Sequence, residues 1–267
     1  LRPAGRLIQL QVIVGQGGQA EQQGQYNGKG AHSGLHSGAA IFGGMLTLVE
    51  ARQGAGRIAG MTTDTHTALL TRIVDDLAEQ GWSLQSPFLT PSLTRELAEE
   101  CRKRAAEGAL APAGVGRGAQ QQIREGVRGD HIQWLEAGQA DACDQYLQAF
   151  DELRVALNQG LYLGLEDFEG HFALYPPGAF YQKHVDRFRD DDRRAVSAVF
   201  YLNEGWQAEQ GGALRLYLPN GETRDVLPQA GSLLLFLSAD MPHEVLPASR
   251  DRLSLTGWFR RRGNGPF

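Results

Sequence analysis

Cysteine and long hydrophobic runs are both scarce in this chain of 267 residues. Its two cysteines, Cys101 and Cys143, lie far apart and form no CxxC pair, which argues against a disulfide framework or a zinc knuckle. Two unpaired thiols fit a reducing compartment, so we expect a cytoplasmic protein. No apolar run reaches the roughly 18 residues of a membrane-spanning helix, and we therefore expect no membrane partner.

Positive charge is also in short supply. The chain has 26 Lys and Arg against 31 Asp and Glu, which gives a net charge of -5 at pH 7. Domains that bind nucleic acid are usually basic, so we expect no nucleic-acid partner. Hydrophobic residues make up 42% and charged residues 21% of the chain, as is ordinary for a globular domain.

Residues 1–60 differ in composition from the rest. They contain 14 glycines, many glutamines and only two acids, Glu21 and Glu50. Such a segment buries too little apolar surface to offset the entropy cost of an ordered chain. The stretch that opens at Met61, MTTDTHTALLTRIVDDLAEQGW, is typical of a protein start. We therefore expect residues 1–60 to be a disordered extension or a mis-called upstream reading frame.

The apolar periodicity that begins near residue 64 predicts helices over 66–80, from Pro91 to about 107, and over 140–158. IQWL at 132–135 is strand-like. From residue 171 onward, eight short apolar runs separated by turn residues predict strands, in HFALYP, FYQKHVD, AVSAVFYL, ALRLYL, RDVL, SLLLFLS, HEVLP and LSLTGWF.

This order of elements predicts a mainly β fold, in which a jelly roll (a double-stranded β-helix) carries the earlier helices on its outer face. We expect one domain over 61–261. Within it, 61–170 would be a helical support region with a Gly-rich loop at 108–130, and 171–261 would be the jelly-roll core.

Two histidines and a carboxylate form a candidate metal site. His184 and Asp186 lie two residues apart on a predicted strand, so their side chains would share one face. His243 begins another predicted strand, which barrel closure can bring across. This ligand set is the facial triad of non-haem Fe(II) oxygenases. The alternative is a surface histidine beside the acidic loop RFRDDDRR. His131 and His171 lack such neighbours, and we interpret them as structural.

Arg252 is a candidate anion anchor. In RLSLTGWF the residues Arg252, Ser254, Thr256 and Trp258 share one face of the predicted strand. If that face points into the barrel, the buried guanidinium requires an anionic partner. If it points outward, Arg252 is one more surface base, and periodicity does not choose between the two. Tyr201, at the end of AVSAVFYL, could add its hydroxyl to the same anion or simply fill the core.

Several motifs in order resemble one family. YPPGAFYQKHVDRF, VFYLNEGW, GGALRLY and PHEVLPASRDRLSLTGWF, together with RGDHIQWLE at 128–136, resemble the 2-oxoglutarate- and Fe(II)-dependent oxygenases. They are most like the prolyl hydroxylase domain enzymes, which include bacterial members. The resemblance covers roughly 81–261.

The resemblance implies roles for individual residues. His184, Asp186 and His243 would ligate iron, while Arg252 and Tyr201 would hold the far carboxylate of 2-oxoglutarate. The other implied co-substrate residues are Tyr175, Leu214, Val245 and Thr256, and the implied substrate residues are Arg194 and Trp258.

The implied activity is hydroxylation of a prolyl residue in a protein substrate with an exposed proline, with hydroxyproline, succinate and carbon dioxide as products. It would require Fe(II), 2-oxoglutarate and dioxygen, with ascorbate as a candidate reductant, and we expect a monomer. Loop 108–130 would close over the substrate, although its Gly- and Gln-rich composition departs from that of the animal enzymes. Two alternatives remain: an oxygenase acting on a free amino acid or another residue, and a non-oxidative metal protein of the cupin type, against which Arg252 argues.

Overall fold

The computed structural model places three helices where the apolar periodicity predicts them. They are α2 (Thr63–Gln80), α3 (Pro91–Ala106) and α4 (Asp141–Leu161). The start of α3 follows from local chemistry, because the Thr90 hydroxyl accepts a hydrogen bond from the Leu93 N–H at 3.2 Å and Pro91 occupies the first turn.

The structure describes residues 63–114, 126–187 and 191–262. The expectations for residues 1–60 and for the centre of the 108–130 loop therefore lie outside the described residues. All described residues belong to a single compact unit.

The strands form two antiparallel sheets. The larger sheet has the order β1-β9-β6-β11-β4-β3-β2, and the smaller has the order β5-β10-β7-β8. The strands of the larger sheet are β1 (Trp82–Gln85), β2 (Ala111–Pro112), β3 (His131–Trp134), β4 (Leu165–Tyr175), β6 (Arg194–Tyr201), β9 (Leu233–Leu237) and β11 (Arg252–Arg261). Those of the smaller sheet are β5 (Tyr181–His184), β7 (Leu214–Tyr217), β8 (Thr223–Val226) and β10 (His243–Val245), with a 3-10 turn, η2 (Ala208–Gln210), before β7.

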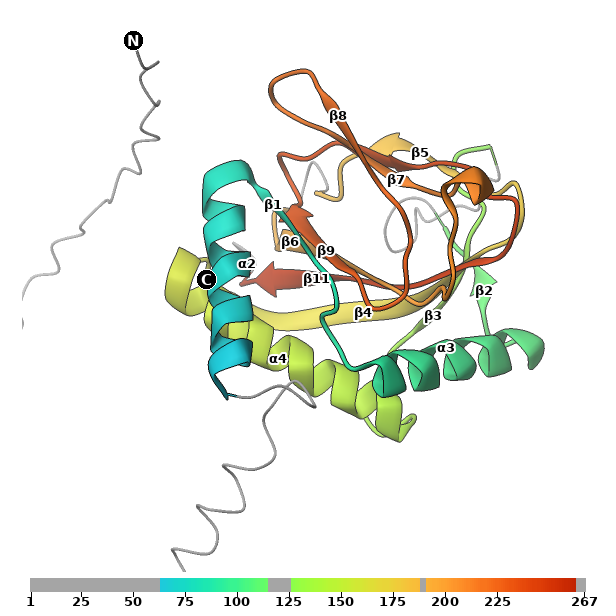
Figure 1. Ribbon diagram of the computed structural model, residues 1–267, viewed down its shortest axis with the longest axis horizontal. Coiled ribbons are helices and arrows are strands. Elements are labelled where there is room, and N and C mark those ends of the chain that lie inside the picture. Colours follow the sequence, from blue (N-terminus) through green and yellow to red (C-terminus); the bar gives the residue numbers. More distant parts are fainter. Residues whose placement is uncertain (1–62, 115–125, 188–190, 263–267) are drawn as a thin grey trace, which may run out of the picture. The chain divides into compact units, whose positions relative to one another are not determined.

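The larger sheet is covered on both faces. Alternate residues of β6, such as Val196 and Phe200, pack with apolar side chains of the three helices. The intervening residues Val199 and Tyr201 pack with Leu214 and other residues of the smaller sheet. In Figure 1 the helices accordingly lie on one side of the larger sheet and the smaller sheet lies on the other. Two facing antiparallel sheets with helices outside confirm the predicted jelly roll.

The structure differs from the sequence-based expectation at the boundary of the core. The strand expected from 171 begins at Leu165, so the boundary at 170/171 falls inside β4. The region 61–170 also supplies β1, β2 and β3 to the larger sheet. The acidic start of β4 gives no strand signal in the sequence, because the residues that stabilise it are distant along the chain. Asp167 and Glu169 both bind Arg260 of β11 at 2.7 Å.

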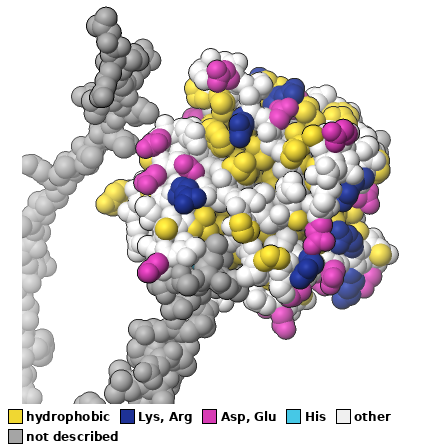
Figure 2. Space-filling model, viewed as in Figure 1, with side chains coloured by type: hydrophobic (Ala, Val, Ile, Leu, Met, Phe, Trp, Pro, Cys, Tyr) yellow, Lys and Arg dark blue, Asp and Glu magenta, His cyan; other side chains and the backbone are white. Residues whose placement is uncertain are grey.

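Charged side chains of both signs are interspersed on the described surface drawn in Figure 2. Many form ion pairs, such as Arg215 with Asp225 at 2.7 Å. Among the described residues, no helix is both long enough and apolar enough to cross a membrane.

Candidate metal centre and co-substrate pocket

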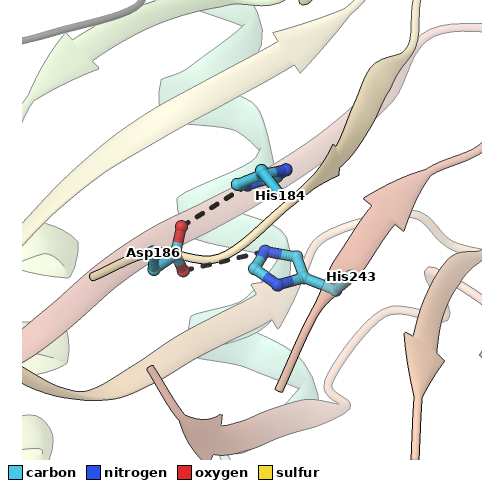
Figure 3. A group of neighbouring side chains, drawn as sticks. All are labelled: His184, Asp186 and His243. Atoms are coloured by element: carbon cyan, nitrogen blue, oxygen red, sulfur yellow. Dashed lines mark ion pairs between the residues drawn. The ribbon is translucent and has the colours of Figure 1, made fainter. Parts of the chain in front are cut away.

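His184, Asp186 and His243 come together between the two sheets. His184 Nε2 lies 3.4 Å from Asp186 Oδ1, and His243 Nε2 lies 3.7 Å from Asp186 Oδ2. One donor atom from each residue falls within 4.8 Å of the other two, close enough for all three to hold one ion. Figure 3 shows the two imidazoles converging on the carboxylate.

The route by which these ligands meet differs from the one the sequence predicted. β5 ends at His184, and Asp186 follows in a bend, so the two do not share a strand face. Instead, His243 of β10 pairs directly with His184 of β5 in the smaller sheet. Directly opposed residues on antiparallel neighbours present their side chains on the same face. Cross-strand pairing therefore unites the histidines, and the turn of the chain after β5 brings in Asp186.

Backbone carbonyls orient both imidazoles. His184 Nδ1 lies 2.7 Å from the Gln182 carbonyl oxygen, and His243 Nδ1 lies 3.1 Å from the Met241 carbonyl oxygen. A carbonyl can only accept, so each Nδ1 carries a hydrogen, and Nε2 of a neutral ring then presents its lone pair. This is the usual arrangement of metal-binding histidines, whose second ring nitrogen is held by a carbonyl or carboxylate.

The charge states also suit a metal. Burial lowers the pKa of His243 to about 4, so its imidazole is neutral at pH 7. Burial alone would raise the pKa of Asp186, but His243, His184 and the Ser197 hydroxyl outweigh it and hold that pKa well below its usual range. A neutral imidazole and an ionised carboxylate are the protonation states in which these side chains bind a divalent ion.

Arg252 is an almost fully buried cation in the cavity that also contains the candidate metal ligands. Its Nε donates to the Gly212 carbonyl at 2.8 Å, while Nη2 is buried without a hydrogen-bond partner in the described structure. The Tyr201 hydroxyl is likewise buried and makes no hydrogen bond of good geometry among the described residues. Burial raises the pKa of Tyr201 to about 12, and the adjacent Arg252 opposes that rise. The Tyr201 ring centroid lies 5.2 Å from the Arg252 guanidinium carbon. A buried charge and an adjacent hydroxyl that lack partners fit a ligand carboxylate.

Tertiary packing decides the question that strand parity left open. Arg252 and Ser254 face the space between the sheets and are buried. The opposite face of β11 carries Leu253, Leu255 and Phe259, which pack in the cluster that includes the helices. Because the helices take the apolar face, the face with Arg252 points inward.

One cavity joins the triad to Arg252. Its volume is about 140 Å³, roughly ten times the space that a single water requires, so it is a ligand pocket. Its walls include the predicted residues Tyr175, Arg194, Leu214, Val245, Thr256 and Trp258. The predicted residue Tyr201 is not among the lining residues; it packs in the core between the sheets, next to Arg252.

The two residues expected to meet substrate are also together. The Arg194 guanidinium carbon lies 3.4 Å from the centroid of the Trp258 ring, and Arg194 binds Glu169 at 3.0 Å. Trp258 Nε1 is buried without a partner in the described structure.

Sequence reasoning missed a second wall of the cavity. Arg128 and Asp130 form a two-pronged ion pair, with Arg128 Nε 2.7 Å from Asp130 Oδ1, and Arg128 also lies over the Tyr181 ring at 4.6 Å. The Tyr181 ring stacks on His184 with centroids 3.6 Å apart. RGD at 128–130 was visible in the sequence, but loop residues have no periodicity. Backbone pairing of the loop with the segment around Tyr181 brings them to the metal site.

His171, which the sequence analysis interprets as structural, lines the cavity. It packs edge-on against Trp134 with ring centroids 5.0 Å apart, and burial lowers its pKa to about 4. His131, by contrast, is not among the lining residues. Of the loop expected to close over substrate, 115–125 lies outside the described residues, and Gly114 at its near end lines the cavity.

Comparisons with known proteins agree with this geometry. Residues 170–260 match the model of the 2OG-Fe(II) oxygenase superfamily. The chain is 30% identical over 209 residues to prolyl hydroxylase EGLN3 of Homo sapiens, covering 74% of this chain and 86% of that one. Among solved structures, a Pseudomonas putida prolyl-4-hydroxylase is 64% identical with a TM-score of 0.68, covering 73% of this chain and 100% of that one.

A second solved structure is a prolyl hydroxylase of Trichoplax adhaerens in complex with a peptide fragment of the hypoxia inducible factor oxygen degradation domain. It is 27% identical with a TM-score of 0.67, covering 76% of this chain and 94% of that one. The chain belongs to the 2-oxoglutarate- and Fe(II)-dependent oxygenases, in their prolyl hydroxylase branch. Some curated relatives are much longer: the alignment covers 30% of the hypoxia-inducible factor prolyl hydroxylase of Caenorhabditis elegans.

Proposed function

We propose that this protein hydroxylates a prolyl residue of a protein substrate, with Fe(II), 2-oxoglutarate and dioxygen, and releases succinate and carbon dioxide. The observation that carries the proposal is the union of two features in one cavity. These are the three convergent metal donors and the buried guanidinium of Arg252, whose Nη2 has no hydrogen-bond partner among the described residues. A cupin-type metal protein has no need of such an anion anchor, so that alternative is not favoured.

The side chains of the cavity would bind and orient the metal and 2-oxoglutarate. Nε2 of His184, Nε2 of His243 and the Asp186 carboxylate would hold the metal, while Arg252 Nη2 and the Tyr201 hydroxyl would hold the far carboxylate of 2-oxoglutarate. When bound, iron and 2-oxoglutarate supply the oxidising chemistry with dioxygen. The buried walls exclude water from that chemistry.

The residues at the mouth of the cavity favour a substrate with an apolar ring, such as proline. Trp134 and Val185 line the cavity although each is 44% exposed. The Trp134 ring lies 6.4 Å from the Trp258 ring, which packs against Arg194. Large exposed apolar groups at a pocket entrance commonly mark a binding surface. The similar Trichoplax enzyme was solved with a peptide, which supports a protein substrate here.

The composition of the chain supports our proposals on the type of partner and the cellular compartment. A net charge of -5 supports a protein partner over a nucleic acid. Two free, buried cysteines support a reducing, cytoplasmic setting. We also propose that the protein acts as a monomer without a membrane partner, with ascorbate as reductant; light scattering and activity with and without ascorbate test these points.

The main experiment incubates purified protein with Fe(II), 2-oxoglutarate and a cell lysate, and searches by mass spectrometry for prolines that gain one oxygen atom. Asp186→Ala protein and wild type without 2-oxoglutarate are the controls. Prolyl oxidation in the complete wild-type reaction alone supports the proposal. If 2-oxoglutarate is consumed but only a free amino acid or another type of residue is oxidised, the prolyl hydroxylase proposal is wrong and the protein is an oxygenase for that other substrate.

A further inference from the structure

Two buried serines lie directly behind the candidate metal centre. The Ser197 hydroxyl is 2.7 Å from Asp186 Oδ2, and the Ser238 hydroxyl is 2.8 Å from that of Ser197. Both serines are at most 1% exposed. Ser197 interrupts the apolar strand β6 between Val196 and Ala198, which are themselves fully buried. A buried hydroxyl in such a strand requires a partner, and here that partner is a metal ligand.

The donor and acceptor in each of these two hydrogen bonds follow from the carboxylate of Asp186, at which the chain of hydroxyls ends. An ionised carboxylate can only accept hydrogen bonds, so Ser197 donates to Asp186. Its single hydrogen is then used, and the Ser238 hydroxyl donates to Ser197. Each hydroxyl in the sequence Ser238, Ser197, Asp186 therefore polarises the next, which strengthens the final bond to the carboxylate.

The chain of hydroxyls links the larger sheet to the segment that follows β5 of the smaller sheet. His184 and His243 lie on β5 and β10 of the smaller sheet, where their Nδ1 atoms are held by carbonyls of their own segments. Asp186 follows the end of β5 and belongs to no strand. Ser197 lies on β6 of the larger sheet, and Ser238 continues β9 of that sheet, its N–H donating to the Ala195 carbonyl at 3.1 Å.

We propose that Ser197 and Ser238 are positioning residues that anchor the Asp186 carboxylate to the larger sheet and so set metal affinity. Ser197 occupies Oδ2 from behind, which turns Oδ1 and its free lone pairs toward the side of His184 Nε2. Without this anchor, Asp186 rotates among side-chain conformers, and the metal meets two well-placed ligands and one poorly placed ligand. This inference rests on the proposed metal centre.

The test measures Mn(II) binding to metal-free protein by calorimetry, with no 2-oxoglutarate present. Loss of a group that orients a metal ligand commonly costs about 10- to 100-fold in metal affinity. We expect a loss in that range for Ser197→Ala and a smaller loss for Ser238→Ala, which leaves the direct bond to Asp186 intact.

The chain offers a matched control. The Ser83 hydroxyl, also fully buried and in the larger sheet, donates to Asp76 Oδ2 at the same distance of 2.7 Å, away from the candidate metal centre. Ser83→Ala removes an equivalent bond, so we expect it to lower the unfolding temperature as Ser197→Ala does but to leave Mn(II) affinity unchanged. Ser197→Thr, which keeps a hydroxyl, is expected to restore binding.

Each outcome decides the inference. Wild-type affinity in Ser197→Ala, or an equal loss of affinity in Ser83→Ala, overturns it. If Ser197→Ala does not fold, Ser238→Ala decides, and unchanged affinity there counts against the anchor. Wild-type protein that binds Mn(II) but hydroxylates no proline refutes the proposed function while leaving the anchor in place; wild-type protein that binds no Mn(II) refutes both.

Discussion

Tyr201→Phe separates the anion anchor from every other part of the pocket. The substitution removes one buried hydroxyl, unpaired in the described structure, and leaves Arg252 in place. If that hydroxyl binds the far carboxylate of 2-oxoglutarate, the variant loses one hydrogen bond to a charged group, worth about 1.5–3 kcal/mol. At about 1.4 kcal/mol per tenfold, 2-oxoglutarate binding should weaken roughly 10- to 150-fold.

Arg252→Ala should cost more, because it removes the charge itself. Truncation of one member of a buried charged pair costs about 2–5 kcal/mol, which exceeds the loss expected for the tyrosine hydroxyl. The predicted order of 2-oxoglutarate affinity is therefore wild type, then Tyr201→Phe, then Arg252→Ala.

Calorimetry on Mn(II)-loaded protein measures this affinity without turnover. A 2-oxo acid of the same length without the far carboxylate, 2-oxopentanoate, is the control ligand, since it cannot use the hydroxyl as anion partner. It should bind Tyr201→Phe and wild type about equally. Equal weakening for both ligands would show a general distortion of the pocket, and unchanged binding of 2-oxoglutarate would refute the assignment of Tyr201 to the anchor.

Three further predictions test other parts of the reasoning. Asp186→Ala should abolish Fe(II)-dependent conversion of 2-oxoglutarate to succinate, because one of the three metal donors is lost; turnover that persists would contradict the triad. Tyr146→Phe should stabilise the fold by about 1 kcal/mol, because the Tyr146 hydroxyl is buried among aromatic rings and has no hydrogen-bond partner among the described residues. The corresponding rise in melting temperature is roughly 2–4 °C, and a fall would show that the hydroxyl has a stabilising role. Removal of residues 1–60 should leave folding and succinate formation intact, as the described site lies wholly within 63–262; circular dichroism and the same turnover assay would expose any dependence on that segment.

The fold could be predicted well where local signals agree. Helices α2, α3 and α4 and most strands after 171 appear near their expected places, because apolar periodicity and turn residues act over a few neighbours. β1 and β2 escaped notice, and so did the start of β4. β1 has only four residues and pairs with β9, about 150 positions further along the chain, while the start of β4 is acidic and binds Arg260 of β11.

In the candidate site, too, some features follow from the sequence and others only from long-range packing. Residue types made His184, Asp186, His243 and Arg252 candidates, because metal and carboxylate chemistry restricts which side chains can serve, and the resemblance of the surrounding motifs to one family assigned their roles. Whether Arg252 points inward could not be decided from alternation, since both faces of β11 are buried. The helices settle it by covering Leu253, Leu255 and Phe259.

The sequence by itself determined which chemistry this protein can carry: two imidazoles, one carboxylate and one guanidinium in an order that a jelly roll can use. Tertiary structure decided how they meet, through the pairing of His184 with His243 and the placement of Asp186 past the end of its strand. It also brought in the Arg128–Asp130 pair and the serines behind Asp186. These contacts join residues from different strands and loops, and such long-range geometry exists only once the two sheets have packed face to face.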